Sequence, residues 1–211
     1  GAGFAMPPVT PEGGPVREGW STSSAVSFVA KTIRTVRMAH EDSPALAVIS
    51  KMLRSMYLHR EIREKGGAYG GFALYSSETG LFNFASYRDP HILATLNAFE
   101  GAAAFIVSGK YTQEDIKEAI LQVCSEIDKP DPPGPAAKKA FYRGLINLSD
   151  DARRGFKERL LELKHDDIVN VGQTYFSSGN HEAGIAVISG EDKLTKANEN
   201  LGGAPLIINK I

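Results

Sequence analysis

Cysteine is almost missing from this sequence, because Cys124 stands alone among 211 residues. A single cysteine excludes an internal disulfide framework and any cysteine-rich metal site. Cys124 lies in an apolar stretch of helical character, so we interpret it as a core residue and not as a nucleophile. The lack of structural cysteines fits reducing surroundings, and we expect the protein in the cytoplasm or in an organelle matrix.

Long apolar runs and an excess of charge are also missing. The longest apolar runs, such as AAAFIV at 102–107, are far too short to span a bilayer. The 24 basic and 25 acidic residues leave a net charge of -1, which gives no bulk attraction to nucleic acid or to an acidic membrane. Residues 1–20 contain no basic region followed by an apolar segment. We therefore expect no nucleic-acid partner, no membrane partner and no secretion.

The common motifs of hydrolases do not occur either. The sequence contains neither HExxH nor HxxEH, the helical motifs that hold a catalytic zinc ion. It also lacks the nucleophile elbow GxSxG and the phosphate loop GxxxxGK[ST]. A metal site built from histidines that are distant in the sequence is the remaining alternative. We expect no metal bound by this chain, whose histidines are His40, His59, His91, His165 and His181.

Segments with strand character mix irregularly with segments of helical character, which predicts an α+β fold. Residues 25–36 are rich in β-branched and aromatic side chains and predict a strand. Residues 45–65 repeat apolar side chains at helical spacing. Two strand-like runs at 68–75 and 81–87, joined by SSETG, predict a hairpin. Further helices are predicted at 89–109, 112–127, 137–147, 150–164 and 166–176, and a last strand at 183–189.

The ends of the chain differ in composition from its middle. Residues 1–24 are rich in glycine and proline and predict a flexible lead-in. Residues 25–190 carry the predicted elements and form the expected domain. Residues 191–211 give no clear pattern and are predicted to form a C-terminal tail.

The segment IREKGGAYGG at 62–71 is the most informative part of the sequence. Gly66 and Gly67 allow a sharp turn between a helix and a strand. Arg63 at the end of the helix and Tyr69 at the start of the strand would then flank one short gap. Such a pair could hold a peptide carbonyl or a carboxylate. The alternative, which spacing alone favours, is that Arg63 binds carbonyls at the helix end and that Tyr69 is half-buried packing.

The segment SYRDPH at 86–91 is a second candidate. Arg88 precedes a predicted helix and could bind a ligand. The favoured alternative is an ion pair with Asp89 or with a neighbour in the hairpin. His59 and His91 are interpreted as surface polar groups.

These two segments resemble the last domain of the pitrilysin/insulinase family of zinc metallopeptidases, in its presequence-protease branch. The resemblance begins with YLHREIREKGGAYGG (57–71) and FNFASYRDPHILATLNAF (82–99). It continues through TQEDIKEAI (112–120) into the proline-rich run DKPDPPGPAAKKAF, and covers roughly residues 25–190. REKGGAYG followed by SYRDP is a specific combination, stronger than either string alone.

The resemblance implies a fold, a cofactor and a set of site residues. It implies an insulinase-type domain with a mixed or antiparallel sheet packed by helices on one face. Intact members hold zinc through HxxEH on their first domain, and an arginine and a tyrosine of the last domain position the substrate. Arg63 and Tyr69 match those two residues, and Gly66 and Gly67 form the turn between them. The opening strands and helix of such a domain are not recognised before residue 25, so we expect an incomplete N-terminus.

The function that follows from the resemblance is that of a non-zinc C-terminal domain in a zinc metalloendopeptidase. Its partners would be unfolded peptide substrates and the remaining domains of the same enzyme, with zinc bound outside this chain. The isolated chain is predicted to be inactive, and an incomplete domain could pair with a second copy through an exposed sheet edge. The alternative is a scaffold or peptide-binding relative with the same fold and no peptidase activity.

Overall fold

A single mixed sheet organises the protein, whose computed structural model describes residues 16–177, 183–202 and 204–211. The strand order is β3-β4-β2-β5-β1-β6. Neighbouring strands are antiparallel from β3 to β5, while β1 runs parallel to both β5 and β6. The bounds are β1 Arg17–Ser21, β2 Ser27–Arg34, β3 Gly70–Ser76, β4 Leu81–Asp89, β5 Gly184–Ser189 and β6 Ile207–Lys210. The predicted α+β class and mixed sheet are confirmed.

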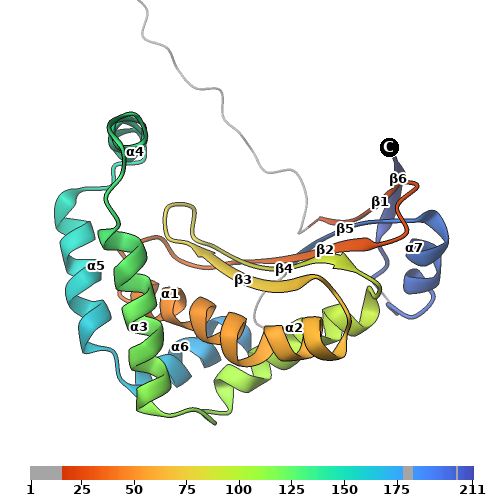
Figure 1. Cartoon of the computed structure of the whole chain (residues 1–211), viewed down its shortest axis with the longest axis horizontal. Helices are drawn as coiled ribbons and strands as arrows, with labels where there is room; N and C mark the ends of the chain where they lie inside the picture. The colour runs from red at the N-terminus through yellow and green to blue at the C-terminus, as the bar shows by residue number, and fades with distance from the viewer. Residues whose placement is uncertain (1–15, 178–182, 203) are drawn as a thin grey trace, which may run out of the picture.

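Helices cover one face of this sheet (Figure 1). The layer contains α1 (Ser43–Met52), its continuation η1 (Leu53–Lys65), α2 (Leu93–Val107), α3 (Gln113–Asp128) and α6 (His165–Phe176). At one end of the molecule, α5 (Asp150–Glu162) packs on α1 and α3, and α4 (Pro133–Leu145) has no buried residue. At the other end, α7 (Glu191–Asn198) packs on β1 and β5.

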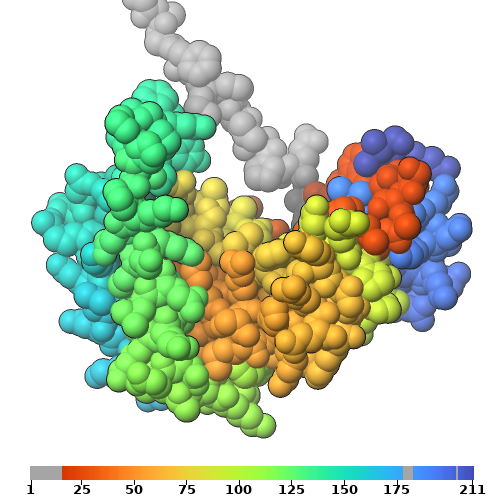
Figure 2. Space-filling model, viewed as in Figure 1, coloured from red at the N-terminus to blue at the C-terminus, as the bar shows by residue number. Residues whose placement is uncertain are grey.

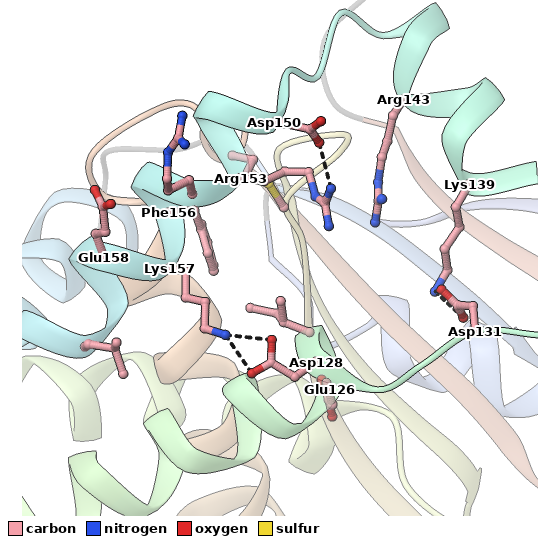
Figure 3. A pocket seen from close by; sticks show the side chains of 14 residues that line it. Glu126, Asp128, Asp131, Lys139, Arg143, Asp150, Arg153, Phe156, Lys157 and Glu158 are labelled. Atoms are coloured by element: carbon pink, nitrogen blue, oxygen red, sulfur yellow. Dashed lines mark hydrogen bonds and ion pairs between the residues drawn. The ribbon is translucent and has the colours of Figure 1, made fainter. Parts of the chain in front are cut away.

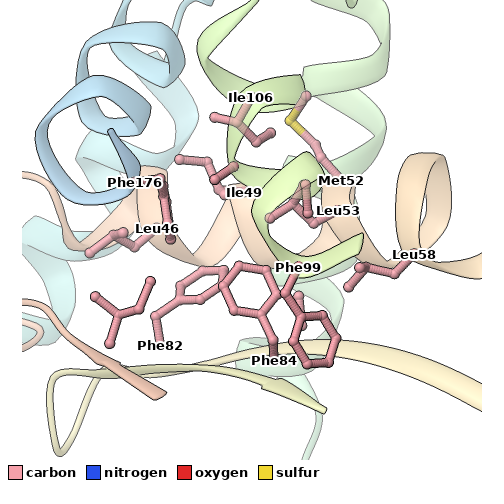
Figure 4. Close-up of a cluster of buried hydrophobic side chains, with 14 of the residues drawn as sticks. Leu46, Ile49, Met52, Leu53, Leu58, Phe82, Phe84, Phe99, Ile106 and Phe176 are labelled. Atoms are coloured by element: carbon pink, nitrogen blue, oxygen red, sulfur yellow. The ribbon is translucent and has the colours of Figure 1, made fainter. Parts of the chain in front are cut away.

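Aromatic and aliphatic side chains fill the space between the sheet and the helices (Figure 4). The ring centroids of Phe82 on β4 and Phe176 on α6 lie 4.8 Å apart, edge to face. Phe84 stacks on Phe99 of α2 with centroids 5.4 Å apart. Leu46, like these phenylalanines, is fully or almost fully buried. Period-2 alternation along β4 therefore places Phe82, Phe84 and Ser86 on the side of the helical layer.

The predicted helix at 45–65 exists, but its two halves are wound differently. The first half is the α-helix α1, and the second half, η1, is π-helical over 13 residues. Asp42 is the N-cap residue of α1 but makes no side-chain cap hydrogen bond. Its Oδ2 instead accepts a hydrogen bond of 2.8 Å from the hydroxyl of Tyr175.

The predicted boundaries at residues 24 and 190 are wrong for the sheet. Residues 17–21, which we expected in a flexible lead-in, form β1 between β5 and β6. Residues 191–211, expected as a tail, supply α7 and β6, and Leu194 and Leu206 are buried at 0% and 3% exposure. Residues 1–15 lie outside the described part of the chain. Short elements with little periodicity leave only a weak sequence signal.

Among the described residues, no helix covers the second face of the sheet (Figure 1). Its side chains are partly exposed, including Leu74 at 50%, Tyr87 at 46% and Ile188 at 40%. In the space-filling view, α4 at one end and β1 with β6 at the other stand higher than the hairpin between them (Figure 2). The open face is thus a shallow apolar surface with raised ends.

Candidate functional site

A tight bend joins the end of η1 to the start of β3. Gly67 has φ +76°, a left-handed conformation that glycine adopts without steric cost. Its amide donates a 3.0 Å hydrogen bond to the carbonyl of Arg63, and the Ala68 amide donates one of 3.1 Å to the carbonyl of Ile62. Ala68 is buried and anchors the bend in the core. These bonds fix the backbone between Arg63 and Tyr69, as in a helix end closed by a left-handed glycine.

The side chains of Arg63 and Tyr69 are both exposed, Tyr69 at 68%. Tyr69 is therefore not half-buried packing, which was one alternative. In the part of the chain that is described, the Arg63 guanidinium makes no hydrogen bond or ion pair, while backbone amides of the two glycines satisfy the Arg63 carbonyl. The arginine does not bind helix-end carbonyls, which was the other alternative. Both groups remain available to a ligand.

The two sequence segments that carried the resemblance meet in space. The Tyr69 amide donates a 3.1 Å hydrogen bond to the carbonyl of Tyr87. The two rings pack edge to face, with centroids 5.8 Å apart and planes at 72°. A Cβ atom added at Gly67 would lie 3.8 Å from Cγ of Pro90. REKGGAYG and SYRDP therefore form one site at the edge of the sheet.

Tyr87 is a site residue that the sequence did not reveal. Its ring also packs on Phe28 of β2, with centroids 5.3 Å apart and planes at 71°. Phe28, Tyr87 and Tyr69 make a continuous aromatic row on the open face. Alternation along β4 places Tyr87 on that face, but only the pairing of β2, β4 and β3 brings the three rings together.

SYRDP contains a β-bulge. Ser27 pairs with Asp89 and Val29 pairs with Ser86, so Phe28 alone stands opposite Tyr87 and Arg88. Arg88 has φ +50° and is exposed. Asp89 is 1% exposed, and its Oδ1 and Oδ2 accept hydrogen bonds of 2.9 Å from the His91 amide and 2.5 Å from the Thr95 hydroxyl. The expected ion pair between Arg88 and Asp89 is absent from the described structure.

No group of three metal-ligating side chains that could hold an ion occurs within the ranges that are described. His59 lies 3.5 Å from the carboxylate of Glu64, and Nε2 of His165 is 2.9 Å from the carbonyl of Gly109. His91 is exposed and His181 lies outside the described residues. Over the same ranges, no helix combines the length and hydrophobicity that crossing a bilayer requires.

An open cavity of about 720 Å³ lies between α3, α4 and α5, away from the bend (Figure 3). Most of its charged side chains pair with one another. Lys157 binds Asp128 at 2.7 Å, Lys139 binds Asp131 at 2.6 Å, and Arg153 binds Asp150 at 2.9 Å. The cavity is therefore an internally neutralised surface, unlike the bend with its exposed Arg63 and Tyr69.

Comparison with known proteins identifies the family to which the chain belongs. The family model of the PreP C-terminal domain matches residues 19–191. The chain belongs to the PreP C-terminal domain family. A mitochondrial presequence protease of Xenopus tropicalis is 37% identical over 174 residues, which are 82% of this chain and 17% of that protein. The chain thus spans about a sixth of the length of this curated relative, which is much longer.

Solved structures agree on the PreP C-terminal domain fold. The crystal structure of pitrilysin superposes with a TM-score of 0.60 at 15% identity, over 94% of this chain and 22% of that chain. The inactive peptidase M16 domain from Pseudomonas fluorescens gives 0.62 at 14% identity, over 82% of this chain and 44% of that one. At these identities the similarity shows the fold alone, which is the predicted insulinase-type domain.

Proposed function

We propose that this PreP C-terminal domain positions unfolded peptides for a zinc metalloendopeptidase whose zinc site, HxxEH, lies on another domain of the same polypeptide. The observation that carries the proposal is the bend at Gly66 and Gly67. Within the described residues, it places the unpaired guanidinium of Arg63 and the exposed phenol of Tyr69 on the two sides of one hydrogen-bonded turn. Family membership supports a peptidase, and the small share of the relative that is covered supports further domains.

Arg63 and Tyr69 have separate roles in this proposal. The Arg63 guanidinium donates hydrogen bonds to a carbonyl of the bound peptide and sets its register. The Tyr69 hydroxyl donates to the oxygen on which charge develops during cleavage, or holds the backbone next to it. A zinc ion bound elsewhere in the polypeptide would polarise the scissile carbonyl and activate water. The isolated chain is accordingly inactive.

The proposal also covers the cellular compartment of the protein and its binding partners. The curated relative is a mitochondrial protein, and we infer an organelle matrix for this one. The partners are unfolded peptides and the remaining domains of the enzyme. A pair of isolated chains joined through a sheet edge stays a prediction, which the molecular mass in solution would test.

The test uses the complete polypeptide that contains this chain. Tyr69→Phe removes only the hydroxyl, and we expect kcat to fall at least tenfold, since removing one such donor costs roughly 100- to 1000-fold in other hydrolases. For Arg63→Ala we expect KM to rise roughly tenfold, because a charged hydrogen bond is lost. Peptide cleavage rates and zinc content are measured together, and the zinc content should not change.

Two matched variants control for nonspecific effects. Arg60→Ala removes another exposed arginine of η1, and Tyr142→Phe removes the hydroxyl of an exposed tyrosine on α4. Both should cleave at the wild-type rate. Wild-type kinetics in Arg63→Ala and Tyr69→Phe would refute the assignment. A complete polypeptide without HxxEH, or without any cleavage, would favour the scaffold or peptide-binding alternative.

A further inference from the structure

The bulge in β4 gives Arg88 an unusual position. Ser86 and Asp89 both point into the helical layer, at 5% and 1% exposure, although strict alternation would place residues three apart on opposite faces. The extra residue between them is absorbed by the bulge, which turns Arg88 outward next to Tyr87. Bulges of this kind re-aim a side chain. Arg88 directly follows Tyr87, whose ring packs on that of Tyr69.

The backbone of Arg88 is strained by this arrangement. Its φ of +50° lies in the left-handed region, which disfavours side chains other than those of asparagine and aspartate. The strain persists because Asp89 is locked in the core by the His91 amide and the Thr95 hydroxyl. Glycine would adopt the same conformation at no cost. Strain of this kind gathers at functional sites.

Arg88 also lacks a charge partner. No group in the described ranges accepts a hydrogen bond from the Arg88 guanidinium or forms an ion pair with it. Both carboxylate oxygens of the adjacent Asp89 already accept hydrogen bonds, from the His91 amide and the Thr95 hydroxyl. Other cations near the bend are neutralised, as Lys65 binds Glu61 at 2.8 Å. Arg63 and Arg88 are therefore two unpaired guanidinium groups on the two segments that meet at Tyr69.

We propose that Arg88 binds a carboxylate of the peptide substrate, as a second guanidinium at the site of Arg63 and Tyr69. This inference rests on the proposed function. A planar guanidinium presents a fork of donors that matches a carboxylate. The carboxylate belongs either to an acidic side chain or to the C-terminus of the peptide, and the two sources need different test peptides.

Arg88→Gly in the complete polypeptide separates a binding role from a structural one. Glycine relieves the left-handed strain, so we expect the melting temperature to stay the same or rise. We expect KM for a peptide with a free C-terminus and one acidic side chain to rise roughly tenfold, with kcat nearly unchanged. Arg88→Lys keeps the charge without the fork and should give an intermediate KM.

The peptide series identifies the source of the carboxylate. If the C-terminal carboxylate is bound, a C-terminal amide abolishes the difference between Arg88→Gly and wild type. If an acidic side chain is bound, the difference between Arg88→Gly and wild type disappears when the aspartate or glutamate of the peptide is replaced by asparagine or glutamine. Arg34→Ala, at an exposed arginine ending β2, is the control and should leave KM unchanged. Equal KM values for wild type and Arg88→Gly, or an increase that neither peptide change removes, would overturn the inference.

The two proposals can fail separately. Loss of activity in Tyr69→Phe and Arg63→Ala, together with wild-type KM in Arg88→Gly, would reject only the role of Arg88. Wild-type kinetics in all three variants would reject the positioning function itself.

Discussion

At the scale of single residues, the site depends on the backbone conformation of Gly67. Its positive φ reverses the chain within two residues, so that Tyr69 leaves the core side and reaches the open face. The open space around the position matters here, since an added Cβ would meet nothing closer than 3.8 Å. A substitution would therefore strain the backbone without a steric clash.

Gly67→Ala should lower the free energy of unfolding by roughly 1–2 kcal/mol, the cost of a left-handed conformation at a residue with a Cβ. We also expect slower peptide cleavage by the complete polypeptide, because the bend that holds Tyr69 relaxes. Urea denaturation and cleavage kinetics measure the two effects.

Gly184→Ala provides the comparison at a glycine without positive φ. An added Cβ there would lie 3.6 Å from the Val16 carbonyl oxygen, an ordinary contact. This variant should be as stable as the wild type or slightly more stable. A Gly67→Ala variant that matched it in both measurements would show that the bend tolerates any residue.

At this scale the sequence was informative about residue types but not about contacts. The glycine pair indicated a bend, and Arg63 and Tyr69 on either side of it were candidates. Tyr87 was not found, because its role comes from the pairing of β3 with β4 and from ring packing across strands. The expected pairing of Arg88 with Asp89 was wrong, because Asp89 is buried and binds the His91 amide and the Thr95 hydroxyl, while Arg88 is exposed.

At the scale of elements, α3 begins with a capping box formed by Thr112 and Asp115. The Thr112 hydroxyl accepts a 3.2 Å hydrogen bond from the Asp115 amide, and Oδ2 of Asp115 accepts one of 2.7 Å from the Thr112 amide. The Thr112 amide, followed by its hydroxyl, holds the pKa of Asp115 below its ordinary value of 3.8. The negative charge also suits the N-terminus of a helix.

Stability should therefore depend on pH through Asp115. Its pKa is lower in the folded state, so its contribution is complete above about pH 4 and is lost as pH falls through the folded-state value. Asp115→Asn should be less stable than wild type at neutral pH, and the difference should shrink toward about pH 3. Urea denaturation midpoints at both pH values measure this.

Glu114→Gln is the control in the same turn of α3. Glu114 has 78% side-chain exposure, and among the described residues its carboxylate binds only Lys117, at 3.2 Å. Because exposed pairs contribute little, this variant should show a much smaller difference at either pH. A difference in Asp115→Asn that stayed constant with pH would contradict the role of its charge.

The helix α1–η1 shows what local pattern leaves undetermined. Its length and its end at Gly66 were predicted closely, but the π-helical winding of Leu53–Lys65 was not. Apolar spacing does not distinguish the two windings over this length, because the wider π-helix shifts side chains only gradually along the same face. Packing of η1 against β3 and α2 accompanies this winding.

At the scale of the whole molecule, the first and last described segments complete the sheet. β1 lies between β5 and β6. Leu194 of α7 packs closely on β1, since a Cβ atom added at Gly19 would lie 3.0 Å from Cδ2 of Leu194. The sequence predicted β5 but neither β1 nor β6. These two strands pair only with segments far away in the chain, and such pairing leaves no local signal.

Removing residues 191–211 should destabilise the domain. The truncation exposes β1 and removes the buried side chains of Leu194 and Leu206. Burial of each leucine contributes about 2 kcal/mol to stability. Together they make a large share of the free energy of unfolding of a typical domain, which is roughly 5–15 kcal/mol. We expect a lower urea midpoint and a tendency to aggregate through the uncovered strand.

Removing Ile211 alone is the control, since that residue is 81% exposed. It should leave the urea midpoint almost unchanged. If the longer truncation were equally stable, residues 191–211 would be a tail after all, as the sequence alone had indicated.

The bulge at Arg88 has a consequence for how this strand can be built. Excising that one residue would join Tyr87 directly to Asp89, and the inward and outward positions from Phe82 onward would then alternate without interruption. The architecture could thus be made from a shorter and less strained β4. As far as the alternation of β4 is concerned, the arginine is a surplus residue, which is consistent with the ligand-binding role proposed for it.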